Sequence, residues 1–256
     1  MGQMDRNFEI NENGHNIRCK LYFNKNQDIK KMIMTCHGFG GQKDNGVTQK
    51  FAEKLLSKYK GVGVLAFNWP CHGDDVKKKM KLEDCTTYLQ MVIEHVKQQY
   101  PIEALYTYSA SFGGYMILKY IAEFGNPFHK IALRCPAVNM YEVLSDSVKR
   151  HGDLDKMKKG KGIPIGFDRK IEVTAAFLEE LKEADVQKIE YIDYADDMII
   201  LHGTKDDSVP FEVSEAFAEE NIIEFYPVEN ADHRFRNPAS MEFATKTVME
   251  FFQLGK

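Results

Sequence analysis

Ser111 stands in a turn of small residues between an apolar run at 104–108 and a helical stretch. Gly113 and Gly114 follow it, and Ser109 precedes it by two positions. A sharp, strained turn of this kind lifts a serine hydroxyl clear of the backbone, where the oxygen can attack a carbonyl carbon. The alternative is a helix N-terminus that Ser109 or Ser111 merely caps. The sequence predicts Ser111 as a nucleophile.

The polar loop 229–235 holds His233, which is the only histidine after His202. A serine nucleophile needs a base to take its proton, and imidazole is the side chain that most often does so near neutral pH. A single histidine is usually a hydrogen-bonded core residue, but this one lies in a polar loop beyond a predicted strand. We therefore expect His233 to be the general base.

A carboxylate must hold that imidazole in the correct tautomer, and the stretch 202–210 offers two neighbouring ones. It reads H-G-T-K-D-D-S-V-P and follows the apolar run 198–201. The spacing H-G-x-x-D-x-x-V-P selects Asp206 as the acid. Asp207 is the competing residue, and its alternative role is that of a solvated turn carboxylate.

The stretch 37–41 reads H-G-F-G-G and follows the apolar run 32–36. Acyl transfer develops negative charge on a carbonyl oxygen, and each backbone N–H group fixed in advance stabilises that charge by about 3 kcal/mol. Glycines let the backbone turn toward a substrate, although a glycine-rich turn without a ligand is the common alternative. His37 is expected to be a structural residue of this loop.

These residues all follow predicted strands, and the strands alternate with segments whose apolar residues recur at the spacing of one helix face. The runs 32–36, 62–67, 104–108, 131–133 and 198–201 are apolar throughout, as strands buried on both faces are. The run 17–23 predicts an antiparallel edge, and 222–226 a late strand before a final helix. This alternation predicts an α/β fold with a mainly parallel central sheet flanked by helices.

The alternation is interrupted between residues 137 and 193, where a Lys- and Gly-rich stretch at 149–162 precedes a short apolar run at 163–165 and a helix from about Glu172. The segment is too long for a simple crossover between strands. We expect a cap or lid inserted above the sheet, within one domain that spans residues 1–256.

The charge, hydropathy and cysteine content narrow the classes of partner and the cellular compartment that we expect. Lys plus Arg total 34 and Asp plus Glu 38, so a formal net charge of -4 gives no attraction to nucleic acid or to an anionic membrane. No apolar stretch approaches the length of about 18 residues that spans a bilayer. The basic run 77–79 with Lys81 and the basic stretch 149–161 are expected to be solvated faces, and the alternative is that they favour an acidic substrate or partner. The five cysteines lack metal-site spacing and are odd in number, which predicts reduced thiols and a cytoplasmic protein.

Taken together, the motifs resemble the α/β-hydrolase superfamily from about Lys31 to the C-terminus, including the order Ser, Asp, His along the chain. The stretches H-G-F-G-G, N-W-P-C-H-G-D at 68–74 and A-D-H-R-F at 231–235, with the insert after Pro136, are similar to cinnamoyl and feruloyl esterases of gut bacteria. Those enzymes use Ser-His-Asp chemistry without a metal or cofactor. The resemblance implies that the chain cleaves small or medium acyl esters, some of them aromatic.

The resemblance also implies that the N–H groups of Phe39 and Phe112 hold the oxyanion. Trp69, Met140 and Tyr141 are candidates for the pocket wall, although most aromatic residues of a sheet protein lie in its core. An acyltransferase, a thioesterase, a serine peptidase and a non-catalytic binding protein of the same fold remain alternatives. The expected partner is a small-molecule ester, and the sequence does not indicate an oligomeric state.

Overall fold

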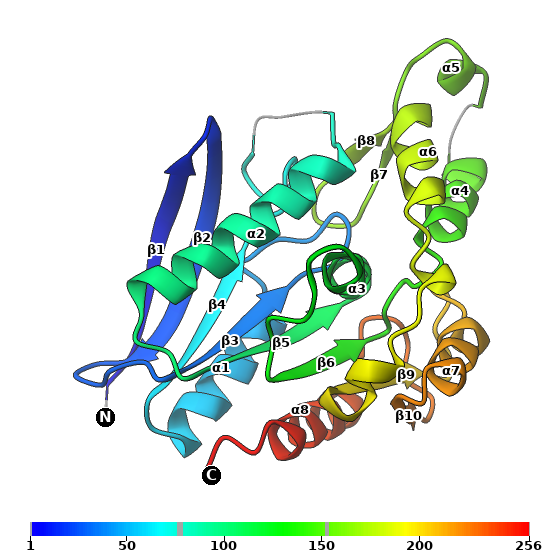
Figure 1. Ribbon diagram of the computed structural model, residues 1–256. Coiled ribbons are helices and arrows are strands. Elements are labelled where there is room, and N and C mark those ends of the chain that lie inside the picture. Colours follow the sequence, from blue (N-terminus) through cyan, green and yellow to red (C-terminus); the bar gives the residue numbers. More distant parts are fainter. Residues whose placement is uncertain (1, 76–78, 152–153, 256) are drawn as a thin grey trace.

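The computed structural model describes residues 2–75, 79–151 and 154–255. Within these residues the strands form one large sheet of order β1-β2-β4-β3-β5-β6-β9-β10 and a separate hairpin of β7 and β8 (Figure 1). Positions 77, 78, 152 and 153 of the predicted basic runs lie outside the described residues.

The large sheet is parallel from β4 to β10, and β1 and β2 extend it as an antiparallel edge. This agrees with the predicted mainly parallel sheet. Its strands are β1 (Gln3–Glu12), β2 (His15–Asn24), β3 (Lys31–Cys36), β4 (Val62–Phe67), β5 (Ala104–Ala110), β6 (Lys130–Arg134), β9 (Met198–Gly203) and β10 (Glu224–Val228).

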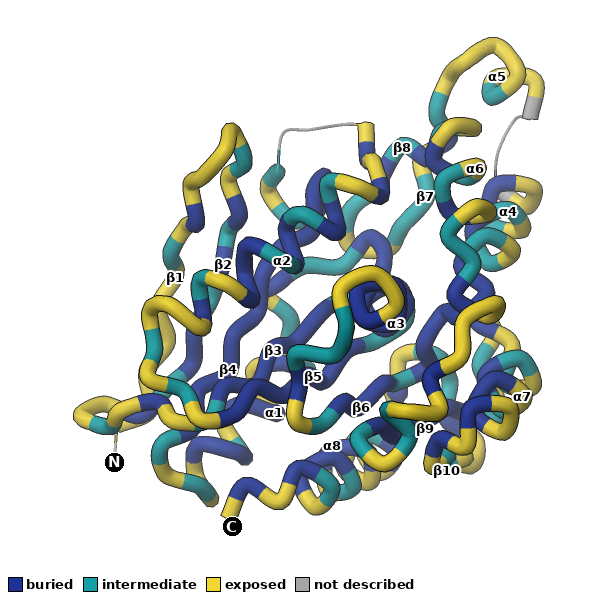
Figure 2. The backbone as a smooth tube through the Cα atoms, in the orientation of Figure 1, coloured by how far each residue is buried: buried dark blue, intermediate teal, exposed yellow. Residues whose placement is uncertain are grey.

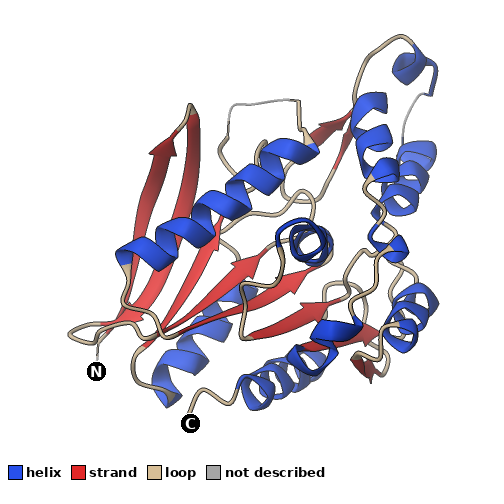
Figure 3. Ribbon diagram, viewed as in Figure 1, coloured by secondary structure: helices blue, strands red, loops and turns tan. Residues whose placement is uncertain are grey.

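Helices cover both faces of the sheet, as Figures 1 and 3 show. The helices between strands of the large sheet and after its last strand are α1 (Gly46–Lys58), α2 (Leu82–Gln99), α3 (Phe112–Phe124), α7 (Phe211–Glu220) and α8 (Pro238–Phe252). Helices α1 and α8 pack into one hydrophobic cluster, and α2 and α3 into the other. Each cluster lies on one face of the sheet, so the central strands are buried between two helical layers.

Burial follows the apolar pattern of the sequence (Figure 2). All six residues of β4 are buried, and so are those of β9, as strands covered on both faces require. Helix α3 is buried from Phe112 to Ile121, because α2 and the inserted segment cover the sides that the sheet does not. Gly125 ends α3 with a φ of 80°, a conformation that glycine adopts without strain.

The predicted insert, residues 137–193, folds beyond the carboxyl ends of the parallel strands (Figure 1). Its elements are α4 (Met140–His151), α5 (Leu154–Lys158), β7 (Ile163–Ile165), β8 (Ile171–Val173), α6 (Ala175–Glu183) and the 3₁₀ turn η1 (Val186–Lys188). A second 3₁₀ turn, η2 (Ile192–Asp197), begins at its end and leads into β9. The helix expected from about Glu172 begins instead at Ala175. Glu172 belongs to β8, and the Thr174 hydroxyl caps the helix by accepting a hydrogen bond from Phe177 N–H.

Hydrogen bonds from two tyrosine hydroxyls to backbone carbonyls join the insert to helix α3. Tyr115 of α3 donates to the Ala184 carbonyl at 2.9 Å, and Tyr191 donates to the Leu118 carbonyl at 3.2 Å. Tyr191 is fully buried, so this contact is part of the core rather than a surface bond. In the described parts of the chain, none of the helices is both long and apolar enough to cross a membrane.

Candidate active site

Ser111 lies between β5 and α3, in a turn that holds its backbone in the left-handed region at φ 53° and ψ -121°. A non-glycine residue pays about 1–3 kcal/mol for such a conformation, which persists only where neighbours enforce it. Ser111 N–H donates to the Arg134 carbonyl at 3.0 Å, and its own carbonyl accepts from Ala137 N–H at 3.2 Å. The neighbouring strand β6 and its following loop therefore hold the turn in place.

Gly113 lets helix α3 approach the neighbouring strand β3 closely. A Cβ at this position would lie 2.3 Å from the Cys36 carbonyl oxygen at the end of β3. Only glycine fits there, which explains the small residues that follow Ser111. Ser109 stands where the common G-x-S-x-G pattern around a nucleophilic serine has its first glycine. Its side chain is buried and shares a hydrogen bond of 2.7 Å with the Thr107 hydroxyl.

His233 and Asp206 meet although 27 residues separate them. His233 Nδ1 lies 2.7 Å from Asp206 Oδ2, and the Asp206 side chain is fully buried. Asp207 is exposed instead, and its carboxylate accepts a hydrogen bond from the Ser208 hydroxyl. The structure thus places Asp206, and not Asp207, against the imidazole.

Asp206 is also held by three further contacts. His202 Nε2 lies 3.0 Å from the same oxygen, Oδ2, and the N–H groups of Ser208 and Val209 donate to Oδ1 at 2.8 and 2.9 Å. Burial alone would raise the pKa of Asp206, but the hydrogen bonds from His202 and His233 outweigh it and hold that pKa below its ordinary range. The carboxylate stays ionised and fixed in direction.

Cys135, His202 and Asp206 bring one possible metal-binding atom each within 4.8 Å of one another. Burial raises the pKa of the Cys135 thiol, which disfavours the thiolate that a metal ion requires. Asp206 Oδ2 is already shared by two imidazoles. These contacts describe a hydrogen-bonded acid, so the donor set fits a resident metal poorly.

The glycine-rich loop 37–41 passes directly beside the serine. A Cβ on Gly38 would lie 3.1 Å from the Ser111 Cβ. Phe39 follows Gly38, and Phe112 opens helix α3, where the first N–H groups have no partner within the helix. The two N–H groups predicted as oxyanion donors therefore belong to the loop beside Ser111 and to the residue that directly follows it.

Two histidines support this loop, namely His37 within it and the fully buried His72. Gly40 N–H donates to His72 Nε2 at 2.9 Å, while His72 Nδ1 lies 2.8 Å from the Pro70 carbonyl oxygen, which fixes a neutral tautomer. Burial lowers the pKa of His72 to about 3 and that of His37 to about 4. His37 Nδ1 lies 2.9 Å from the Gly38 carbonyl oxygen. Both imidazoles are thus neutral structural groups near neutral pH, as expected for His37.

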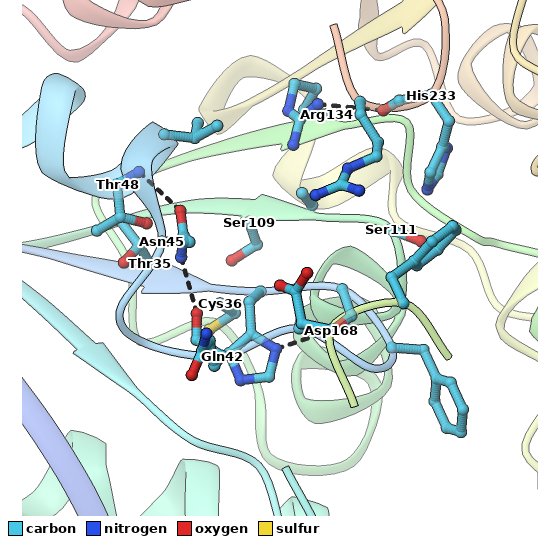
Figure 4. Close-up of a pocket in the computed structure, with 18 of the residues that line it drawn as sticks. Thr35, Cys36, Gln42, Asn45, Thr48, Ser109, Ser111, Arg134, Asp168 and His233 are labelled. Atoms are coloured by element: carbon cyan, nitrogen blue, oxygen red, sulfur yellow. Dashed lines mark hydrogen bonds between the residues drawn. The ribbon is translucent and has the colours of Figure 1, made fainter. Parts of the chain in front are cut away.

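Ser111 and His233 line one pocket, which runs from them toward the start of helix α1 (Figure 4). Among the described residues, the hydrogen bonds do not include one between these two side chains, and such bonds often tighten only when substrate is bound. The other residues that line the pocket are Thr35, Cys36, His37, Gly38, Phe39, Gly41, Gln42, Asn45, Val47, Thr48, Tyr108, Ser109, Ala110, Arg134, Phe167, Asp168 and Arg234.

The tip of the β7–β8 hairpin closes one side of this pocket with Phe167 and Asp168. Arg169 N–H donates to the Gly40 carbonyl at 3.0 Å, and its guanidinium donates to the carbonyls of Gly73 and Asp75. The inserted segment therefore contacts the glycine-rich loop directly.

The structure does not bring Trp69, Met140 or Tyr141 to this pocket. Trp69 is fully buried and donates from Nε1 to the His37 carbonyl at 3.0 Å, so it supports the loop from beneath. Met140 is buried, and it lines with Tyr141 a different hollow between α4 and the end of α6. The aromatic and methionine pattern did not distinguish the core from the pocket wall.

Several residues of the site were not identified from the sequence. His72 lies in the stretch 68–74 that carried the resemblance, but no role was assigned to it. Phe167 and Asp168 belong to a hairpin that carries no motif. Arg134 offered one usable signal, because it is a charged residue at the carboxyl end of a buried strand. The remaining contacts depend on which loops the fold brings together.

Solved structures share this architecture. Est1E from Butyrivibrio proteoclasticus with ferulic acid bound is 21% identical, with a TM-score of 0.74 over 97% of this chain and 100% of Est1E. A putative hydrolase from Agrobacterium vitis S4 is 15% identical, with a TM-score of 0.76 over 99% of this chain and 100% of that one. Mouse alpha/beta hydrolase domain-containing protein 10 is 14% identical, with a TM-score of 0.70 over 98% and 100%. At identities this low, the structural similarity establishes the fold and no more.

With its mainly parallel sheet, its helical layers and these neighbours, the chain has the α/β-hydrolase fold and is an α/β serine hydrolase. It belongs to the prolyl oligopeptidase family, whose sequence pattern matches residues 54–254. No curated protein matches the chain.

Proposed function

We propose that the chain hydrolyses carboxylic esters of small or medium acyl groups, aromatic ones included, through Ser111, His233 and Asp206. The observation that carries the proposal is the bond of 2.7 Å between His233 Nδ1 and the buried Asp206, with His233 and Ser111 in one pocket. The ferulic acid bound to Est1E supports an aromatic acyl group as a candidate substrate. In this proposal the insert 137–193 acts as a small lid over the site.

The proposed reaction has two halves. His233 takes the proton of the Ser111 hydroxyl as its oxygen attacks the ester carbonyl, and the N–H groups of Phe39 and Phe112 stabilise the resulting oxyanion. His233 then gives the proton to the leaving alcohol. Water attacks the acyl-enzyme by the same steps in reverse order, while Asp206 holds the imidazole tautomer and stabilises its charged form.

The test is hydrolysis of p-nitrophenyl esters from acetate to longer chains, together with methyl ferulate, by the wild type and by Ser111→Ala. We expect kcat to fall by on the order of 10⁴ or more in the variant. A fluorophosphonate should label the wild type and leave Ser111→Ala unlabelled. Unlabelled, folded wild-type protein would rule out the proposed nucleophile.

Asp206→Asn provides a second test with a matched control in the next residue. The amide cannot impose the correct imidazole tautomer, so kcat should fall by about 10⁴. Asp207→Asn removes a carboxylate that is exposed and lies one position away, so its kcat should stay within about twofold of the wild type. Equal losses in the two variants would contradict the proposed role of Asp206.

A serine peptidase is the second candidate, because the chain belongs to the prolyl oligopeptidase family. Both reactions share the acyl-enzyme, and they differ in the leaving group that His233 must protonate. Comparing an ester with the anilide of the same acyl group separates them. A higher kcat/KM for the anilide would favour the peptidase.

A further inference from the structure

Arg134 occupies an unusual place for a charged side chain. It ends strand β6, it lines the Ser111 pocket, and its Nη1 donates to the His233 carbonyl at 3.1 Å (Figure 4). Its guanidinium also lies over the Phe235 ring, 5.2 Å from the centroid. These two contacts hold the cation in a fixed direction at the edge of the proposed catalytic centre.

The charge of Arg134 has no partner in the described parts of the chain. None of the ion pairs there involves it, and its Nε is a buried atom without a hydrogen bond. Tyr108, a second lining residue that is only 7% exposed, interacts with the Arg134 side chain through its buried hydroxyl, and that hydroxyl has no acceptor for its proton among the described residues. Unsatisfied donors of this kind cost about 1–3 kcal/mol each, so such groups are usually paired.

Arg234 adds a second cation to the same pocket. Its guanidinium lies over the Phe167 ring of the hairpin tip, 5.4 Å from the centroid, and both residues line the pocket. Arg234 also takes part in none of the ion pairs between described residues. Guanidinium groups bind carboxylates through paired hydrogen bonds, which makes two unpaired arginines beside one cavity a recognition element for an anion.

Asp168 is the single carboxylate among the residues that line the pocket, and it lies on the opposite side. Figure 4 shows Arg134 beside His233, with Asp168 across the pocket near the glycine-rich loop. Asp168 acts electrostatically on His37, which belongs to that loop. The pocket lining therefore holds two arginines and one carboxylate, and an anionic ligand group is attracted to the arginines and repelled by Asp168.

We propose that Arg134, Arg234 and the Tyr108 hydroxyl form a carboxylate-binding subsite, so that the preferred substrates carry a carboxylate near the scissile carbonyl. This inference rests on the proposed ester hydrolysis and narrows its substrate class. The carboxylate would supply the missing acceptor for the donors described above. Arg134 is partly buried, which strengthens an ion pair there relative to one in bulk water, whereas Arg234 is exposed and contributes less.

The test compares two matched pairs of esters. Monomethyl terephthalate and dimethyl terephthalate differ by a carboxylate on the acyl group, and 4-acetoxybenzoate and its methyl ester differ by one on the leaving group. We expect the wild type to favour the anionic member of at least one pair. Arg134→Gln and Arg234→Gln should each lower the ratio of kcat/KM, anionic over neutral, by on the order of tenfold.

Using a ratio removes any loss common to both esters, such as a shift of the His233 loop when Arg134 is changed. Arg234 belongs to the same loop, but its side chain forms no hydrogen bond to the described residues, so its variant tests the charge without removing a hydrogen bond that holds the loop. Arg236→Gln is the matched control, because Arg236 is 71% exposed, pairs with Asp232 and does not line the pocket. Its ratio should equal that of the wild type, and Arg134→Lys should retain part of the preference.

Ratios unchanged in both glutamine variants, or a wild type that favours the neutral ester in both pairs, would overturn the subsite. Fluorophosphonate labelling of the same variants separates this failure from that of the proposed function. Labelled Ser111 with unchanged ratios removes only the subsite. Absent labelling in the folded wild type removes the hydrolase proposal itself.

Discussion

His72 supports the glycine-rich loop from outside the pocket that Ser111 and His233 line. It is fully buried, it accepts the Gly40 N–H bond, and burial lowers its pKa to about 3. An unfolded histidine titrates near 6.5. Between about pH 6.5 and pH 3 the unfolded chain therefore binds a proton that the folded chain does not, so acid lowers the free energy of unfolding across this window.

This linkage predicts a measurable difference between the wild type and His72→Gln. Glutamine keeps an oxygen that can accept from Gly40 N–H but does not titrate. On going from pH 7 to pH 5, the wild type should lose about 2 kcal/mol more of its unfolding free energy than the variant. Urea unfolding at the two pH values measures both losses. Equal losses would contradict a neutral His72 in the folded protein.

At the residue scale, the sequence identified those candidates that local spacing marks. The register of 202–210 distinguished Asp206 from Asp207, and the small-residue turn marked Ser111. The cations of the pocket carried no such mark, because Arg134 and Arg234 become neighbours of the serine only after separate strands have aligned. Trp69 was expected in the pocket wall, since aromatic character alone does not reveal which face of a loop is covered.

At the scale of elements, the hairpin and the glycine-rich loop are packed too closely for a side chain between them. Gly40 has a φ of +75°, and a Cβ there would lie 2.6 Å from both Gly166 Cα and Phe167 N. Gly40→Ala should therefore destabilise the protein by about 2 kcal/mol and lower ester hydrolysis. Thermal unfolding and kcat/KM measure the two effects.

Gly46→Ala is the control for this substitution. Gly46 opens helix α1, and a Cβ there meets no atom within 4 Å. Its stability should stay unchanged or rise by up to about 1 kcal/mol, since alanine lowers the entropy of the unfolded chain. If both variants behaved alike, the contact between hairpin and loop would have no energetic weight.

Apolar periodicity predicted the elements of the core well and those of the edges poorly. The strand expected at 62–67 is β4, residue for residue. Strand β1 carried no distinct signal, because nine of its ten residues are not buried and its alternation is lost. Strand β8 was taken for the start of a helix, since three residues are too few to show a period of two.

At the scale of the whole molecule, the described cysteines are all buried, and none of them forms a disulfide. Burial raises the pKa of Cys36 to about 12 and also raises the pKa values of Cys19, Cys85 and Cys135. A disulfide reagent such as DTNB should therefore react slowly with the native protein and titrate five thiols in denaturant. Fast reaction of several thiols at neutral pH would contradict the packing described here.

Gly40 connects His72 and the β7–β8 hairpin through the N–H and the carbonyl of its own backbone. Its N–H group holds the loop to His72, and its carbonyl accepts from Arg169 at the hairpin tip. In hydrogen exchange, the amides of Gly40 and Arg169 should consequently open together as one cooperative unit. If the two segments open together, a ligand that raises the opening free energy of the hairpin raises that of the glycine-rich loop by the same amount.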